Sequence, residues 1–366
     1  MQTTAWPVST PSLVHESSDL SSHLAPFAAL LKRSENRRAL EAYLRGLAAT
    51  IPSKTASGIA AHDHGTSSQR LQEFLTRTVW DEAHLNALRI RTLVGGADHG
   101  VEDEGAIVIG DELLRKTGSS SVGVARHRAG GTRAINAQRL VTAHYAGNSG
   151  HWPIAARLYL PAEWAGDPAR RARARIPADI GYATPGAIAL DLLDIAQGMR
   201  VPATHVVIEA GLAGDSSFLD ALEHRGQRYL VHRESTITDS ASLRGARWTP
   251  TDAADAVPGA RPREFARIRL SRLTASRRPA DKPGYLIGVR DAGSSHDASF
   301  YYAWGMDDQP NGALLRLAGR LDARRRFYDE ARAQLGLEDY EGRLWPGLNR
   351  HIALVMLAHT LRCHLA

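Results

Sequence analysis

Cysteine and long apolar runs are scarce in this chain of 366 residues. Its single cysteine, Cys363, excludes an internal disulfide framework and a zinc site built from cysteines. The most apolar stretch, 351–359, is far too short to cross a bilayer. The first twenty residues lack a basic segment followed by an apolar core, unlike a secretory signal. We therefore expect a cytoplasmic protein without a membrane partner.

Lysine is also rare, although basic residues as a group are not. Lys and Arg total 45 against 39 acidic residues, for a formal net charge of +6, and only four of the 45 are Lys. Arginine offers planar, bidentate donors that suit phosphate, and a basic surface favours polyanions such as DNA. A GC-rich genome would produce the same bias, so composition alone leaves both interpretations open.

Three segments of different character follow one another along the chain. They are a leader rich in Ser, Thr and Pro (1–23), a helical region (24–95) and a larger part that mixes strands and helices (96–366). In the helical region, one amphipathic repeat begins at Ser34, a candidate N-cap, and a pair is broken near Trp80, where Asp81 suits a second cap. We expect a poorly ordered leader and a helical bundle that is a candidate for DNA binding.

The larger part shows the element order of a mixed α/β sheet. Strand patterns at 106–110, 121–128, 135–147 and 153–161 precede a helix at 186–199, a strand at 204–209, a helix at 215–226 and a strand at 228–233. Hairpin-like strands followed by alternating helices and strands predict an RNase H-like core sheet with flanking helices. A β-rich insertion is predicted at 234–306, followed by long helices at 312–335 and 346–364.

Five blocks, in the same order, resemble insertion-sequence transposases of the DDE superfamily. They are RSENRRALEAYLRGL (33–47), LQEFLTRTVWD (71–81), SVGVARHRAGGTRAINAQ (121–138), WPIAARLYLPAEWAGDPARR (152–171) and LGLEDYEGRLWPGLNRHIALVMLAH (335–359). The resemblance covers nearly the whole chain and implies an RNase H-like enzyme that cuts and joins DNA. Such enzymes use two divalent metal ions held by two Asp and one Glu, because hard cations prefer anionic oxygen ligands.

All three acid positions implied by the resemblance are altered here. Counting back from SVGVAR without a gap, the first Asp falls on Gly110, and Asp111 takes a variable acidic position. A slip of one residue that placed Asp111 in the site would reverse the direction of its side chain. In HVVIEAGLAGDSS (205–217), Glu209 replaces the second Asp, and Arg325 replaces the Glu.

These changes predict a transposase-derived protein that binds double-stranded DNA but has lost strand cleavage, in a domesticated or regulatory role. Arg325 would repel Mg²⁺ and pair with Glu209 or Asp111 in the remnant cleft. Glu341 belongs to a supporting motif of the family, and His144 is a candidate general base. No metal site or cofactor is expected, and Mg²⁺ would be needed only if cleavage survives.

Six cationic side chains are candidates for DNA contact: Arg37, Arg38, Lys116, Arg126, Arg324 and Arg332. Two alternatives to a non-cutting DNA-binding protein stay open. One is an enzyme that reuses the emptied cleft for metal-independent chemistry on a small molecule. The other is a residual metal-dependent nuclease with Asp111, Glu209 and Glu341 as rearranged ligands. The sequence leaves open whether the protein forms an oligomer.

Overall fold

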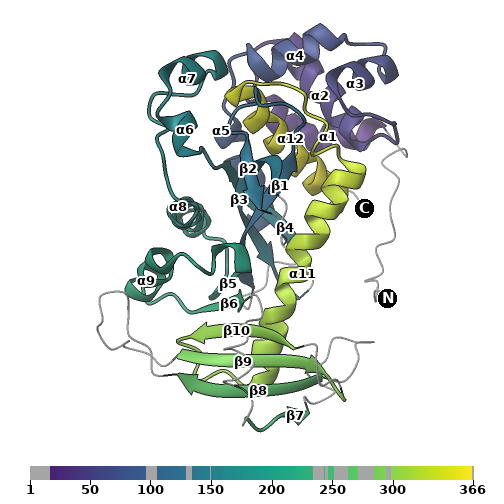
Figure 1. The fold of residues 1–366 in the computed structure, drawn as a ribbon. Helices are drawn as coiled ribbons and strands as arrows, with labels where there is room; N and C mark the ends of the chain where they lie inside the picture. The colour runs from purple at the N-terminus through teal and green to yellow at the C-terminus, as the bar shows by residue number, and fades with distance from the viewer. Residues whose placement is uncertain are drawn as a thin grey trace.

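The protein is built around one mixed β-sheet with helices on both faces (Figure 1). The structure, a computed structural model, describes residues 17–95, 105–128, 134–148, 150–233, 243, 246–250, 263–270, 284–293 and 298–364. The helices are α1 (Ser17–Ala28), α2 (Ser34–Ala48), α3 (Ala56–His62), α4 (Ser68–Thr76), α5 (Glu82–Gly95), α6 (Ala162–Ala165), α7 (Pro168–Ala174), α8 (Pro185–Gly198), η1 (Ala210–Leu212), α9 (Ser216–His224), α11 (Asn311–Gln334) and α12 (Trp345–His364). The strands are β1 (Ala106–Arg115), β2 (Ala125–Arg128), β3 (Ala134–Ala146), β4 (His151–Leu158), β5 (His205–Ile208), β6 (Tyr229–Arg233), β7 (Thr249–Pro250), β8 (Arg263–Leu270), β9 (Gly284–Asp291) and β10 (Ser299–Trp304).

The strand order is β2-β3-β1-β5-β6-β10-β9-β8-β7, and β4 also pairs with β3. β1 is antiparallel to β3 and parallel to β5, which in turn is parallel to β6. β10 pairs antiparallel with β6, so the strands of the insertion continue the core sheet. The predicted mixed α/β sheet with flanking helices is confirmed.

The two faces of the sheet have separate apolar layers, and β1 contributes to both by alternation. Ile107 and Ile109 pack with α8 and α9, whereas Val108 packs with α11 on the other face. Because successive strand side chains point to opposite faces, Gly110 faces α11 and Asp111 faces away from it. This alternation separates the two residues that the sequence placed at the first acid position.

The N-terminal helices share one hydrophobic core with the C-terminal helix α12. Arg350 of α12 donates to the carbonyl oxygens of Leu75 and Trp80, at 3.0 and 2.8 Å. Helix α5 is capped as predicted, since Asp81 accepts from the backbone amides that follow it. Helix α2 begins at Ser34 itself, so its N-cap is Arg33, which forms no side-chain cap, and the expectation for Ser34 was wrong by one residue.

Several boundaries differ from the prediction for local reasons. β1 continues to Arg115 because its pairing with β3 is unbroken along ten residues. The predicted strand at 121–128 begins only at Ala125, since Gly123 adopts a positive φ of 70° in a turn. Residues 17–23 of the predicted leader belong to α1, while 1–16, the hinge residues 96–104 and much of 234–298 lie outside the described residues. None of the described helices combines the length and apolar character needed to span a membrane.

His351 is a fully buried histidine held in its neutral form, which predicts a pH dependence of stability. Its Nε2 donates to the carbonyl oxygens of Gly336 and Leu337 at 3.1 and 3.2 Å, and Tyr43 donates to its Nδ1 at 2.8 Å. Burial lowers the pKa of His351 to about 4, and burial does the same for His151. The unfolded chain takes up these protons near pH 6.5, so stability falls as the pH drops from 6.5 towards 4.

We expect each of these buried histidines to lower the free energy of unfolding by about 2 kcal/mol as the pH falls from 7 to 5. Urea denaturation at several pH values measures the slope. The variant His351→Gln should show a shallower slope than the parent, whatever its absolute stability. An unchanged slope in that variant would contradict the assignment.

Candidate functional site

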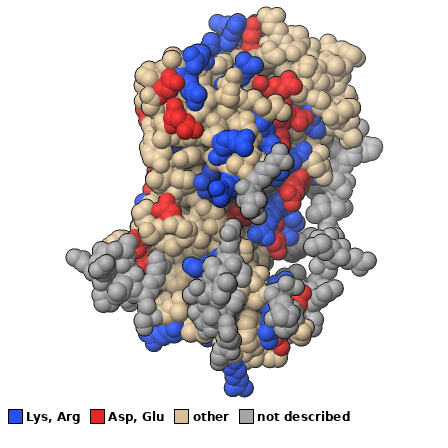
Figure 2. Space-filling model, viewed as in Figure 1, with Lys and Arg blue, Asp and Glu red and all other residues tan. Residues whose placement is uncertain are grey.

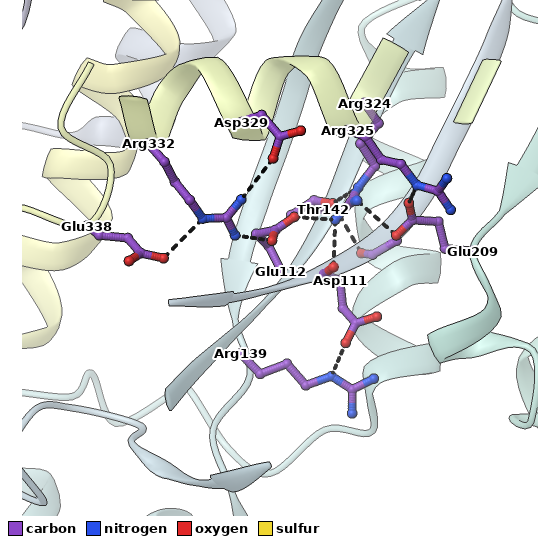
Figure 3. A network of polar contacts seen from close by, with 11 residues as sticks. Asp111, Glu112, Arg139, Thr142, Glu209, Arg324, Arg325, Asp329, Arg332 and Glu338 are labelled. Carbon is purple, nitrogen blue, oxygen red and sulfur yellow. Dashed lines mark hydrogen bonds and ion pairs between the residues drawn. The ribbon is translucent and has the colours of Figure 1, made fainter. Parts of the chain in front are cut away.

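The candidate site lies on the α11 face of the sheet, where the carboxyl end of β5 meets the middle of β1 (Figure 3). Ile109 pairs with Ile208 across these parallel strands, so Gly110 and Glu209 are lateral neighbours. The backbone amide of Glu209 donates to the carbonyl oxygen of Ile109 at 2.9 Å, which fixes this alignment. Helix α11 crosses above both residues and brings arginines to the same point.

Arg324 of α11 is the centre of the site. Its guanidinium is 2.8 Å from Glu209 Oε2 through Nη1 and 3.2 Å from Glu112 Oε2 through Nη2. It also donates to the Asp111 carbonyl oxygen at 2.7 Å and to Thr142 Oγ1 at 2.9 Å. The Arg324 side chain is 2% exposed, so a full positive charge is buried here and every nitrogen of its fork has an acceptor.

Gly110 is the residue that leaves room for this arginine. A Cβ at position 110 would lie 2.4 Å from Glu209 Oε2 and 2.9 Å from Arg324 Cζ, both shorter than atoms tolerate. The space that an aspartate side chain would need is therefore filled by the ion pair of Arg324 and Glu209. The absence of a side chain at position 110 and the presence of the buried arginine depend on each other.

Arg325, the residue expected to fill the former metal site, takes a peripheral place. Its Nε is 3.6 Å from Glu209 Oε1 and its Nη1 is 3.7 Å from Asp322, but its side chain is 52% exposed. The predicted ion pair with Glu209 is present, whereas the buried cation is the neighbouring Arg324. The sequence carried a signal for this, because Leu321, Arg324 and Tyr328 follow the helical spacing of the buried stripe.

A second arginine extends the network along α11. Arg332 contacts Glu112 Oε1 and lies 3.0 Å from Glu338 and 3.7 Å from Asp329. Burial raises the pKa of the Glu209 carboxyl, and the charges of Arg324 and Arg325 oppose that rise. The two carboxylates that face α11 are thus each bound by more than one guanidinium.

Asp111 points to the opposite face and has a different partner. Its Oδ2 accepts from Arg139 Nε at 2.7 Å, and its Oδ1 lies against the backbone at Gly211.

Glu341 is exposed in the loop before α12. His144 is buried beside His151, with 3.2 Å between Nε2 and Nδ1, and its ring packs against Phe327. Of the residues expected in the cleft, the structure brings Glu209 and Arg325 together and gives the other three separate surroundings.

The six cationic residues considered for DNA contact divide into two groups. Arg37, Arg38 and Arg126 are exposed. Lys116 donates to the carbonyl oxygen of Tyr340 at 2.9 Å, and Arg324 and Arg332 belong to the network described above. In this conformation the Arg324 side chain is too buried to contact a phosphate, which differs from its expected role.

The sequence was compared with protein-family models and with curated proteins. A family model described as DDE superfamily endonuclease matches residues 26–282. The chain belongs to this family. The search of curated proteins found no match. Membership confirms the resemblance seen in the sequence and the RNase H-like character of the core sheet, and it implies a nucleic-acid substrate.

DDE endonucleases are expected to hold divalent metal ions, and the residues of this site do not fit them. A metal ion needs converging carboxylate oxygens with free lone pairs. Here Glu209 and Glu112 are already bound by arginines, Asp111 faces the other side of the sheet, and Gly110 supplies no ligand. Within the described part of the chain, no group of three or more His, Cys, Asp or Glu side chains is arranged to hold a metal ion.

Proposed function

We propose that this DDE-superfamily protein binds duplex DNA and does not cut it by two-metal chemistry. The observation that carries the proposal is the Arg324 guanidinium, buried over Gly110 and between Glu209 and Glu112. The resemblance to the family assigns metal-binding carboxylates to this part of the sheet, and a fixed positive charge there supports the proposal. Binding without cutting suits a regulatory or domesticated role and requires no metal cofactor.

Electrostatics explains why a metal ion would not displace the arginine. A divalent cation at this point would face a buried guanidinium within a few ångströms, in surroundings where charges interact more strongly than in water. Moving Arg324 aside would leave its charge to be solvated elsewhere and would open hydrogen bonds to Thr142 and to the Asp111 carbonyl. Breaking a buried network of this kind costs several kcal/mol.

DNA binding is supported by exposed arginines on neighbouring elements. We call Arg77, Arg126, Arg128, Arg173 and Arg175 the arginine rim; all five are exposed. Contacts between segments next to them show that some of the elements that bear them are neighbours. Arg175 Nη1 lies 3.4 Å from the Thr76 carbonyl at the end of α4, and Trp164 of α6 donates to the Val124 carbonyl just before β2. In Figure 2, basic side chains interspersed with acidic ones lie on the end of the molecule that holds α7 and the helical region.

Two measurements on the full chain test the proposal. Incubation of supercoiled plasmid with Mg²⁺ or Mn²⁺ is expected to give no nicking. Fluorescence anisotropy with a labelled duplex is expected to show binding that weakens steeply between about 50 and 200 mM salt, because phosphate contacts release counterions. The variant Arg126→Gln/Arg128→Gln should reduce both the affinity and the salt dependence.

Metal-dependent nicking that disappears in the variant Glu209→Gln would overturn the non-cutting part of the proposal. The comparison with this variant separates activity of the site from nuclease contamination, which would survive the substitution. A duplex affinity that is absent, or that does not respond to salt, would overturn the DNA-binding part.

A further inference from the structure

Just before the start of α8, on the face of the sheet opposite α11, the protein has an exposed aromatic side chain. Tyr182 is 53% exposed, and it is the only aromatic among the large exposed apolar side chains of the described residues, which also include Val79 and Ile195. It lies in the loop between α7 and α8. Tyr159, at the end of β4, stands beside it with ring centroids 6.3 Å apart and an edge-on angle of 69°.

The loop that presents Tyr182 is held in place by its neighbours. Arg171 of α7 donates to the carbonyl oxygens of Ile180 and Pro177 at 2.7 and 2.8 Å. On the other side, the Thr184 hydroxyl caps α8 by accepting from the Ala187 amide at 3.1 Å. The Tyr182 ring is therefore presented by a fixed loop, and little conformational freedom is lost when it forms a contact.

A guanidinium group lies beside this tyrosine pair. The backbone amide of Tyr159 donates to the Arg139 carbonyl, and the Arg139 guanidinium lies 6.0 Å from the Tyr159 ring centre. Asp111 orients Arg139 through a contact of 2.7 Å. Exposed Arg115 falls on the same face of β1 as Asp111 by strand alternation. On the edge strand β2, which pairs with β3, the same alternation turns His127 to this face and Arg126 and Arg128 to the other.

We propose that Tyr182 is a stacking platform for the bases of single-stranded DNA, with Arg139 and Arg115 beside the flanking phosphates. The inference rests on the proposed DNA binding and adds the kind of DNA that is preferred. Single-stranded nucleic acids bind where aromatic rings stack on exposed bases inside a basic surface, because every base has a π-face. A fully paired duplex hides these faces, so an unpaired segment fits the platform better. An apolar protein ligand would cover the guanidinium groups without offering acceptors to them.

The test uses the full chain and two fluorescent probes of equal length: a fully paired duplex and the same duplex with a short central gap that leaves thymidines unpaired. We expect the gapped probe to bind about tenfold more tightly, which is the size of one base–aromatic stack. Tyr182→Ala should remove this preference and leave the affinity for the paired duplex unchanged. Tyr182→Phe, which keeps the ring, should retain it, and Ile195→Ala is a matched exposed control that should change nothing.

The outcomes separate this inference from the proposed function. Equal binding of the two probes, or a preference that survives in Tyr182→Ala, would overturn the stacking platform while duplex binding still stands. If neither probe binds, the proposed DNA binding fails and the platform fails with it. Because Tyr182 is exposed, its replacement is expected to leave the fold intact, and an unchanged melting temperature checks this.

Discussion

Replacing Arg324 with methionine is expected to lower the free energy of unfolding by about 3–5 kcal/mol. Methionine preserves most of the length and apolar volume of the side chain but removes the charge. Glu209, at 13% exposure, then loses the guanidinium at 2.8 Å, and Glu112 loses one of its two arginine partners. The Thr142 hydroxyl and the Asp111 carbonyl lose a donor at the same time. The main source of the cost is the buried Glu209 carboxylate, which keeps only the half-exposed Arg325 at 3.6 Å.

Arg325 provides a matched control on the same helix. It carries the same charge and also contacts Glu209, but at 3.6 Å and with a half-exposed side chain. Arg325→Met is therefore expected to cost only about 0–1 kcal/mol, as for other surface ion pairs. Urea denaturation of both variants measures the difference. Losses of similar size would mean that Arg324 is not the buried cation of the site.

A double-mutant cycle isolates the contact between Arg324 and Glu209. If the loss of the close partner of the Glu209 carboxylate causes the destabilisation, Glu209→Gln combined with Arg324→Met should be more stable than the sum of the single effects predicts. The expected coupling is favourable and at least about 1 kcal/mol. Additive effects would place the cost of Arg324→Met in packing against Tyr328 instead.

Much of the fold was predictable because its signals are local. Strand alternation and helical periodicity located the core elements within a few residues, and the order of elements matched a mixed sheet. Strand geometry also indicated that Asp111 and Gly110 face opposite sides, which the contacts of Asp111 with Arg139 show in the structure. These features depend on the pattern of neighbouring residues, which a single sequence contains.

The identity of the buried cation was harder to predict from motif spacing. Alignment to a motif gives the position Arg325, but the rotation of α11 against the sheet decides which of two adjacent arginines turns inwards. That rotation is set by the buried stripe that includes Phe327, Tyr328 and Ala331. Lys116 and Arg332 were likewise predicted to contact DNA, and in the structure their long side chains bond to distant backbone and carboxylate groups. Such partners are far apart in the sequence, so no local pattern reveals them.

Gly110→Asp alone is expected to destabilise the protein by about 1–3 kcal/mol, although it would add the acid that the resemblance to the family places at this position. The new Cβ would meet Glu209 Oε2 at 2.4 Å and Arg324 Cζ at 2.9 Å, so the network must shift to admit it. Gly118→Asp is the matched control, because a Cβ at Gly118 has nothing within 4 Å. Thermal denaturation should show a lowered melting temperature for the first variant and little change for the second.

Combining Gly110→Asp with Arg324→Ala is expected to create a divalent-cation site that the parent lacks. The first change adds a carboxylate beside Glu209 and Glu112, and the second removes the guanidinium that binds both and fills the space. Three carboxylates without their shared counter-charge repel one another, and a hard cation relieves that repulsion. Millimolar Mn²⁺ should therefore raise the melting temperature of the double variant, by the linkage between binding and stability, and leave the parent and Arg324→Ala unchanged. If Mn²⁺ leaves the double variant unaffected, or stabilises the parent to the same extent, Arg324 does not occupy the place of the metal.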